Sequence, residues 1–167
     1  TGGTTTGGTT TSNIAFDGGT CKCAGATVGY KQVINGTTYT VVDNSTIAGQ
    51  ISAGNVNLCT TLVTNMSGAP NNTGNNFFGE QYPNSTFNSN ISFWDTSNVT
   101  DMNHMMYGAN SFNQDISLWN VSNVTNMAGM LAFGSGSPFN QDIGGWNVSN
   151  VTNMRNMFQS ATAFYGD

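Results

Sequence analysis

Three cysteines and one histidine are the side chains best suited to chemistry in this sequence. Cys21 and Cys23 are separated by one residue, while Cys59 and His104 lie much farther along the chain. Zinc ligands come in closely spaced pairs, and this spacing matches no such site, so we predict no metal. The polar, charge-poor composition instead favours one disulfide in an oxidising setting, in which Cys59 pairs with Cys21 or Cys23. Three reduced thiols are the alternative.

Catalysis is not expected from the remaining residues. His104 lies near Asp101, but no Ser or Cys shares its position in the repeats described below. This favours a surface histidine over a general base. The sequence contains no phosphate-binding loop, dinucleotide fingerprint or zinc-hydrolase motif. We therefore predict no catalytic residue, no cofactor and no enzymatic activity.

The low charge of the chain restricts its partners and its location. Only 7% of the residues are charged, against a usual share of about 25%. The net charge is −5, and the only basic residues are Lys22, Lys31 and Arg155. Nucleic-acid binding needs clustered Lys and Arg, so we expect no such partner. No apolar run approaches the ~18 residues that cross a bilayer. We expect a secreted or cell-surface, extracellular protein without a membrane span.

The chain is organised around a motif that occurs three times. FNSNISFWDTSNVTDM begins at Phe87, FNQDISLWNVSNVTNM at Phe112 and FNQDIGGWNVSNVTNM at Phe139, which gives a period of about 25 residues. A degenerate copy, LCTTLVTNM, begins at Leu58. Self-similarity at such a period is typical of stacked repeats, in which each copy buries the apolar face of its neighbour. The sequence therefore predicts a solenoid.

Spacing within each copy predicts its elements. Apolar and polar residues alternate around a tryptophan that occurs once per copy, which is the period of a strand. Apolar residues then recur at intervals of three and four, which is the period of a helix. We predict an α/β repeat fold in which short parallel strands and short helices alternate. The tryptophans are Trp94, Trp119 and Trp146. Recurring asparagines at one register predict an internal ladder of hydrogen bonds to the backbone; they are Asn98, Asn123 and Asn150.

Composition divides the chain into three parts. Residues 1–13 are expected to form a Thr/Gly-rich linker or extended arm. Residues 14–57 are expected to form a β-rich N-terminal cap, because Asn35-Gly36 between β-branched residues indicates a hairpin. Residues 58–167 are expected to form the repeat solenoid, with an insertion at about 68–85. Asp115 and Asp142 are expected to stabilise turns, with a calcium site as the alternative.

Two surfaces of this arrangement are candidates for binding. Residues flanking each inward tryptophan are expected to point outward as a ladder, which suits a carbohydrate or protein partner; a solvated face is the alternative. That ladder comprises Phe93, Asp95, Leu118, Asn120 and Asn147. Phe164 and Tyr165 begin another copy of the motif. Either the parent chain is longer, or another chain covers this end, in which case the tract containing Thr4, Thr5 and Thr6 is the candidate covering strand.

The repeated pattern FNQDIS-W-x-V-S-N-V-T-N-M resembles the BspA-like leucine-rich-repeat surface proteins, over about Leu58 to Asp167. The preceding segments CKC and INGTTYTVVDNSTI resemble the flavobacterial type of these proteins. The insertion and the Gly134-Ser135-Gly136 extension depart from the pattern. The resemblance implies a leucine-rich-repeat-like solenoid, a place at the cell surface and a role in adhesion, and it supplies no catalytic residue.

Two functions are compatible with these expectations. The first is an adhesin-type binding module that recognises a protein or carbohydrate on another surface. The second is a structural subunit of an extracellular fibre or surface coat, which joins copies of itself through the open solenoid end and the N-terminal arm.

Overall fold

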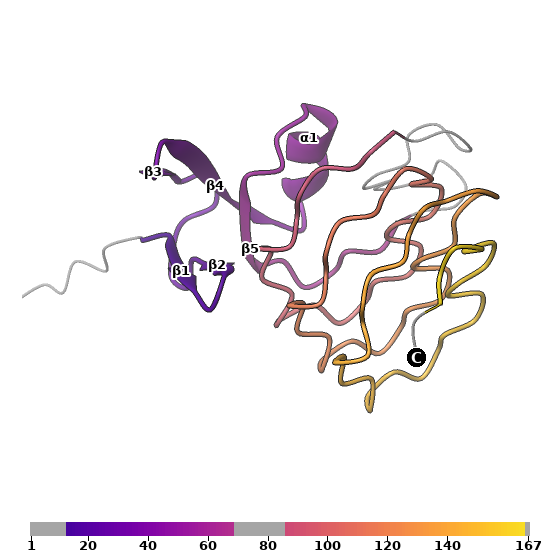
Figure 1. Cartoon of the computed structure of the whole chain (residues 1–167). Helices are drawn as coiled ribbons and strands as arrows, with labels where there is room; N and C mark the ends of the chain where they lie inside the picture. The colour runs from indigo at the N-terminus through magenta and orange to yellow at the C-terminus, as the bar shows by residue number, and fades with distance from the viewer. Residues whose placement is uncertain (1–12, 69–85, 166–167) are drawn as a thin grey trace, which may run out of the picture.

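The computed structural model describes residues 13–68 and 86–165 (Figure 1). Its secondary structure lies in the first half of the chain: β1 (Ala15–Asp17), β2 (Thr20–Lys22), β3 (Lys31–Ile34), β4 (Thr37–Asp43), α1 (Ile47–Ser52) and β5 (Leu58–Leu62). β1 and β2 form a two-stranded antiparallel sheet. The second sheet has the order β3-β4-β5, in which β3 and β4 are antiparallel and β4 and β5 are parallel. The part of the predicted insertion at 69–85 lies outside the described residues.

The hairpin expected around Asn35-Gly36 is confirmed. Ile34 pairs with Thr37 and Gln32 with Tyr39, so a two-residue loop joins β3 to β4. Asn35 and Gly36 have φ values of 49° and 82°. Both positions of a type I′ turn need positive φ, and asparagine and glycine tolerate it better than other residues. The local sequence therefore decides this element.

Helix α1 follows a turn that one carboxylate stabilises. Asp43 Oδ1 accepts hydrogen bonds from the backbone N–H of Ser45 and of Thr46, and from both of their hydroxyls. The hydroxyls of Thr46 and Ser45 are the main reason that the pKa of Asp43 lies below its usual value. Ile47, the first residue of α1, is fully buried. It joins the same apolar core as Leu58 and the repeats, so the N-terminal part and the repeats share one core.

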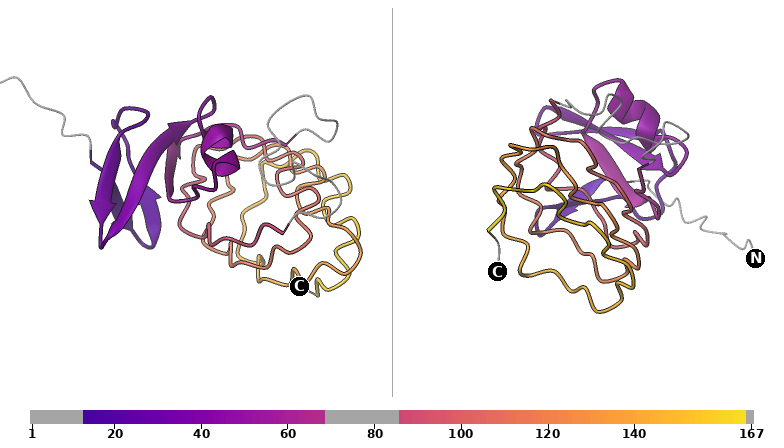
Figure 2. Two further views of the ribbon diagram at one scale, coloured as in Figure 1. Left: turned by 90° about the horizontal axis from the view of Figure 1, so that it is seen from above. Right: turned by 90° about the vertical axis from the view of Figure 1, so that its right-hand side faces the viewer.

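The copies of the motif lie side by side in sequence order (Figure 2). The backbone N–H of Thr100 donates to Thr64 O at 2.9 Å, that of Thr125 to Thr100 O at 2.8 Å, and that of Thr152 to Thr125 O at 2.8 Å. The expected asparagine ladder is confirmed. Asn98, Asn123 and Asn150 donate through Nδ2 to the carbonyls of Thr61, Ser97 and Ser122, each at 2.7 Å. Equivalent bonds in every copy thus set the register between neighbours.

The predicted fold class is wrong. The described structure has two small sheets and one short helix, and it is not a leucine-rich-repeat-like solenoid of alternating strands and helices. In the described part of the chain beyond Leu62 there is neither a helix nor a named strand. The copies consist of turns joined by single parallel bridges, namely Asn65–Asp101, Asp101–Asn126 and Asn126–Asn153.

The direction of the backbone N–H groups explains why helices are absent from the described repeats. An α-helix needs each N–H to bond to the carbonyl four residues earlier. Here alternate N–H groups donate to the next copy: Met127 to Asn153 O, Gly129 to Arg155 O and Leu131 to Met157 O, at 2.8 to 2.9 Å. Gly129 also has a φ of 61°, which interrupts a right-handed helix. The three-residue interval between Met127 and Met130 instead spans a turn, since Met130 N donates to Met127 O at 3.1 Å.

Side chains of asparagine and aspartate explain why the expected strands are absent from the described copies. Asp95, Asn120 and Asn147 each accept, through Oδ1, the backbone N–H two residues later, at 3.1 Å. Such side-chain bonds compete with strand pairing and favour turns. The same role is confirmed for Asp115 and Asp142, which accept from Ser117 N and Gly144 N at 2.8 and 2.9 Å.

The core of the repeats is built from equivalent apolar side chains. The three tryptophans point inward as expected: Trp94, Trp119 and Trp146 are 1%, 3% and 9% exposed. Each indole N–H donates to a carbonyl of a preceding segment: Val56, Ile91 and Ile116, at 3.0, 3.2 and 3.2 Å. Phenylalanines stack in the same way: Phe87 on Phe112, Phe112 on Phe139 and Phe139 on Phe164, with ring centroids 5.9, 6.1 and 5.9 Å apart. The amphipathic tryptophan is suited to this site because its N–H has a partner.

One glycine shows how tightly neighbouring copies approach. A Cβ added to Gly129, which has a φ of 61°, would lie 2.6 Å from the His104 ring. We therefore expect Gly129→Ala to lower the free energy of unfolding by about 2 to 3 kcal/mol, from backbone strain together with overpacking. Gly136→Ala is the control: its φ is also positive, but nothing lies within 4 Å of the added Cβ. We expect it to cost about 1 kcal/mol. Equal losses in urea titrations would show that the close approach is absent.

Candidate functional site

The predicted outward ladder is only partly outward. Leu118 is 55% exposed, and Asn120 and Asn147 are exposed as well. Phe93 is half-buried. Asp95 is 1% exposed, which corrects its assignment to an exposed face. The Oδ1 atoms of Asn120 and Asn147 already accept the turn hydrogen bonds described above. Asp95, Asn120 and Asn147 therefore stabilise turns of the fold, and Leu118 is the most exposed apolar member of the ladder.

Asp95 instead fastens the N-terminal strands to the repeats. Its Oδ1 lies 2.8 Å from Lys22 Nζ, at the end of β2. The same atom accepts from the hydroxyl of Ser97 at 2.7 Å, and Oδ2 accepts from the hydroxyl of Thr61 at 2.8 Å. Burial alone raises the pKa of Asp95, but these hydrogen bonds, led by that from Lys22, outweigh it and hold the pKa below 3.8. Asp95 is therefore a charged structural residue.

Removing this charge has an expected cost that depends on pH. We expect Asp95→Asn to lower the free energy of unfolding by about 1 to 3 kcal/mol at pH 7, because the donors around Asp95 lose a charged acceptor. The folded pKa lies below the unfolded value of 3.8. The carboxylate therefore contributes its stability above about pH 4 and loses it as the pH falls through the folded pKa. Urea titrations of both proteins should show a smaller difference in the free energy of unfolding at pH 2 than at pH 7.

A matched change at the other partner checks this assignment. Lys22→Met keeps the length of the side chain and removes its charge. Its effect should be smaller than that of Asp95→Asn, because the Lys22 side chain is 37% exposed and that of Asp95 only 2%. A larger loss from the lysine change would contradict the central role of the carboxylate.

The cysteines form one pair and one free thiol. Cys23 is joined to Cys59, so the structure selects one of the two pairings left open by the sequence. This disulfide ties the segment after β2 to β5. Cys21 is a free, fully buried thiol. Burial, and then the negative charge of Asp95, raise the pKa of Cys21 to about 12. A thiol in this state is a poor nucleophile and metal ligand.

His104 packs against one aromatic side chain and one amide side chain. It is half-buried, which is more enclosed than expected of a surface residue, and burial lowers its pKa. The ring packs edge-on against Tyr107, with centroids 5.2 Å apart, and Nδ1 lies within hydrogen-bond distance of Asn103 Oδ1.

Over residues 13–68 and 86–165, no group of three His, Cys, Asp or Glu side chains is placed to hold a metal ion. The one helix among the described residues, α1, is too short to span a bilayer.

The candidate assembly residues fall in two places. Thr4, Thr5 and Thr6 lie outside the described residues. Phe164 stacks on Phe139 and also on Phe158; the ring centroids of Phe164 and Phe158 are 4.6 Å apart. Tyr165 is 82% exposed, and its backbone N–H donates to Asn140 Oδ1 at 2.9 Å. Phe164 and Tyr165 therefore repeat the contacts made by the equivalent residues of earlier copies.

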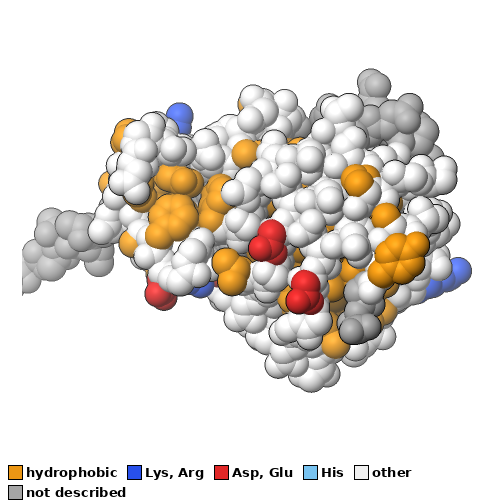
Figure 3. All heavy atoms as spheres, viewed as in Figure 1, with side chains coloured by type: hydrophobic (Ala, Val, Ile, Leu, Met, Phe, Trp, Pro, Cys, Tyr) orange, Lys and Arg blue, Asp and Glu red, His pale blue; other side chains and the backbone are white. Residues whose placement is uncertain are grey.

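An aromatic cluster lies where the N-terminal strands meet the first complete copy of the motif. Phe16 of β1, Tyr39 of β4 and Phe93 form a triangle of ring contacts, with centroids 5.2, 5.7 and 6.1 Å apart. Phe16 is 42% exposed. Figure 3 shows an apolar patch over the N-terminal strands on this face of the molecule. An exposed apolar patch of this kind marks a candidate site of recognition.

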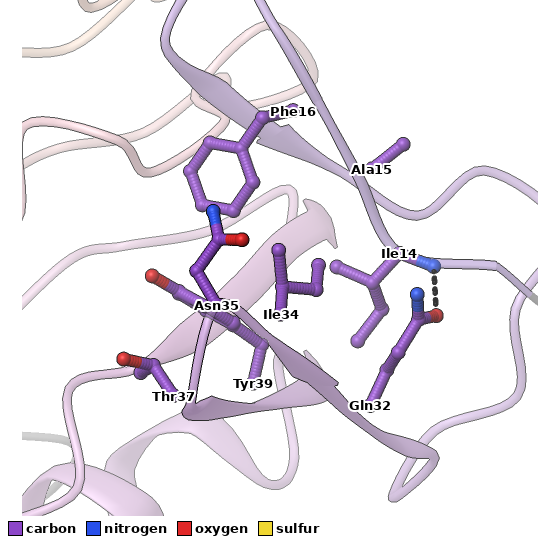
Figure 4. Close-up of a pocket in the computed structure, with 8 residues that line it drawn as sticks. All are labelled: Ile14, Ala15, Phe16, Gln32, Ile34, Asn35, Thr37 and Tyr39. Atoms are coloured by element: carbon purple, nitrogen blue, oxygen red, sulfur yellow. Dashed lines mark hydrogen bonds between the residues drawn. The ribbon is translucent and has the colours of Figure 1, made fainter.

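A pocket opens beside this cluster (Figure 4). Its volume is about 390 Å³. It is lined by Ile14, Ala15, Phe16, Gln32, Ile34, Asn35, Thr37 and Tyr39. None of these residues carries a charged side chain at neutral pH. The pocket combines an apolar floor and wall with a few amide and hydroxyl groups, which is the usual composition of a small-molecule site.

The lining of the pocket is positioned by β3, β4 and residues 14–16. In β3 and β4, Gln32 pairs with Tyr39 and Ile34 with Thr37, so these four side chains share one face of the hairpin. Residues 14–16 lie over that face, and the N–H of Ile14 donates to Gln32 Oε1 at 2.9 Å. Burial raises the pKa of the Tyr39 hydroxyl, and Cys21 adds to this shift. The phenol is therefore neutral and acts as a hydroxyl donor or acceptor.

Sequence reasoning missed this site. The alternation of Gln32 with Ile34 and of Thr37 with Tyr39 is visible in the sequence and indicates a common face. The other wall is a three-residue strand, β1, whose position follows from tertiary packing. A strand this short carries too little periodic signal to be recognised.

Comparison with known proteins concerns the repeats. The model of a protein family described as "Mycoplasma protein of unknown function, DUF285" matches residues 71–167, which is more than half of the chain. No curated protein and no solved structure matches the chain with significance. The matched residues include all three full copies of the motif. This chain therefore belongs to the family described as Mycoplasma protein of unknown function, DUF285.

Proposed function

We propose that this chain is an adhesin-type binding module of a secreted cell-surface protein, related to the BspA-like surface proteins of the flavobacterial type. The observation that carries the proposal is the uncharged pocket beside the exposed ring of Phe16. A module that holds a cell to another surface needs a recognition site on a rigid support. The pocket lies between two small sheets, and its lining residues Ile14, Ile34 and Tyr39 belong to or pack against the apolar cluster that contains the Cys23–Cys59 disulfide. A disulfide also favours an oxidising, extracellular location.

Two reactive side chains outside the pocket, Cys21 and Asp95, are buried, which favours binding over chemistry. Among the described residues, Cys21 is the one cysteine outside the disulfide, and its thiol is buried and protonated. Asp95 is bound by four donor groups from Lys22, Ser97 and Thr61. These groups are committed to structure, whereas the amides and hydroxyl groups of the pocket lie at its surface.

A retention assay tests the proposal. The purified chain would be applied to wells coated with mucin, wells coated with basement-membrane extract and wells blocked with albumin. We expect retention at least ten times that of the albumin wells on one of the two coats. A chain that is retained by neither coat would overturn the adhesin assignment.

Self-assembly is the second candidate function. On the last described copy of the motif, Val148, Met154 and Phe158 are 39%, 42% and 38% exposed, which would suit association of copies into a fibre or coat. Negative-stain microscopy of the same sample separates the two candidates. Isolated particles that bind a coat support the binding module, and ordered polymers that bind neither coat support the structural subunit.

A further inference from the structure

We propose that the pocket between β1 and the β3-β4 hairpin binds a neutral saccharide, such as a terminal sugar residue of a glycan. This inference rests on the proposed function and names the class of ligand that the module recognises. Phe16, Gln32, Asn35, Thr37 and Tyr39 are the residues that would contact it. The argument combines the charge, the aromatic wall and the hydrogen-bonding groups of the pocket.

The charge of the lining sets the first limit on the ligand. No Lys, Arg, Asp or Glu lines the pocket. A phosphate, sulfate or carboxylate group would find no cation to compensate it, and a basic peptide would find no carboxylate. Desolvating a charge without a partner is costly, so a neutral ligand is favoured.

The aromatic wall suits the apolar face of a sugar ring. Phe16 is 42% exposed, and its contact with Tyr39 is edge-on, with an interplanar angle of 72°. Tyr39 also meets Phe93 edge-on, at 87°. These contacts hold the rings in place while part of the Phe16 ring stays open to solvent. An aromatic face carries a negative quadrupole, which attracts the weakly positive C–H groups on one side of a sugar ring.

Hydrogen-bonding groups in the lining suit the hydroxyl groups of a sugar. A sugar hydroxyl both donates and accepts, and so do the Asn35 amide and the Thr37 hydroxyl. Gln32 Oε1 already accepts the N–H of Ile14, which fixes this amide and leaves its Nε2 group as a donor. Figure 4 shows the Asn35 amide directed to the side of the pocket on which the Phe16 ring lies. Amide and aromatic ring thus face the same space.

The position of the pocket favours a sugar over an extended peptide. A peptide strand that joins a sheet uses backbone hydrogen bonds along an exposed sheet edge. The pocket instead lies on the face of the hairpin that carries Gln32, Ile34, Thr37 and Tyr39. Its volume of about 390 Å³ is near the lower end of the range for small-molecule sites, roughly 300 to 1,000 Å³. A compact ligand with polar groups around an apolar face fits these features.

Competition with released oligosaccharides tests the inference on the coat that retains the chain. Oligosaccharides would be released from that same coat and separated into neutral and acidic fractions, and the deglycosylated coat protein would serve as third competitor. We expect the neutral fraction to reduce retention at least ten-fold, and the other two competitors to leave it unchanged. Competition by the acidic fraction alone, or by the deglycosylated protein alone, would overturn the assignment of a neutral saccharide while the adhesin proposal stands. Retention by neither coat would overturn both.

Three variants locate the site. Asn35→Gly removes the amide and keeps the positive φ that the turn requires, since glycine adopts it readily. Phe16→Leu removes the flat ring and keeps an apolar side chain. We expect Asn35→Gly and Phe16→Leu each to reduce retention at least ten-fold. Val33→Thr is the control, because Val33 is 66% exposed and alternates with Gln32 and Ile34 on the opposite face of β3. Thermal unfolding of all three variants should lie near that of wild type. If Asn35→Gly and Phe16→Leu were then both retained in full, this pocket would be excluded as the binding site.

Discussion

Trp119→Ala is expected to lower the free energy of unfolding by about 3 to 5 kcal/mol, the usual cost of deleting a buried tryptophan side chain. Trp119 is 3% exposed and lies in the middle copy of the motif, between those of Trp94 and Trp146. Its indole N–H donates to Ile91 O at 3.2 Å. The alanine variant would lose the apolar burial and leave that carbonyl without its donor. Urea titration followed by circular dichroism measures the loss.

Two further variants separate the contributions. Trp119→Phe keeps much of the apolar volume and removes the N–H, so it should cost less than Trp119→Ala. Leu118→Ala, at the adjacent position, should change stability by less than about 1 kcal/mol, because Leu118 is 55% exposed. If Leu118→Ala proved as costly as Trp119→Ala, the inward and outward faces of the repeats would be assigned the wrong way round.

Loss of the Cys23–Cys59 disulfide is expected to have the second large effect. The two cysteines are separated by 36 positions in the sequence. For a loop of this length, the chain-entropy model gives a stabilisation of about 3 to 4 kcal/mol. The double change Cys23→Ala and Cys59→Ala should lower the free energy of unfolding by about that amount. The alanines avoid adding a buried hydroxyl group at sites that are 1% and 0% exposed.

Thiol counting checks the pairing independently. Alkylation in denaturant should modify one cysteine before reduction and three after it, and the first should be Cys21. In the native protein at pH 8, Cys21 should resist alkylation, because it is buried and its pKa is raised to about 12. Modification of three cysteines without reduction, or a disulfide-linked peptide that contains Cys21, would contradict the observed pairing.

The sequence alone determined the parts of this protein that depend on local geometry or on strict repetition. Asn35-Gly36 specified the hairpin, because few other residue pairs accept two successive positive φ angles. Repetition placed Trp119 in the core, since a large apolar side chain at one register in every copy is buried by the next copy. It also placed Asn123 at a backbone carbonyl of the neighbouring copy. In each case one local rule acts without competition.

The same local rules failed where backbone hydrogen bonds had more than one partner available. The interval between Met127 and Met130 fits a helix and a turn equally well, and the choice depends on whether the N–H groups bond within the copy or to the next one. Here they bond to the next copy, so the predicted α/β solenoid was wrong. Asp95 was misplaced for a related reason. Its register predicts an outward side chain, but Asp95 is buried and bonds to Lys22 of β2 and Thr61 of β5.

Tertiary structure alone decided the pairing of the cysteines and the candidate site. Cys21 and Cys23 are two residues apart, and local sequence gives no reason to prefer either as the partner of Cys59. The choice follows from how β2 packs against β5. The pocket depends on tertiary packing as well, because Phe16 and Asn35 line the same space only when β1 lies over the β3-β4 hairpin. Contacts between segments that are distant in sequence have no periodic signature, and so only the folded chain reveals them.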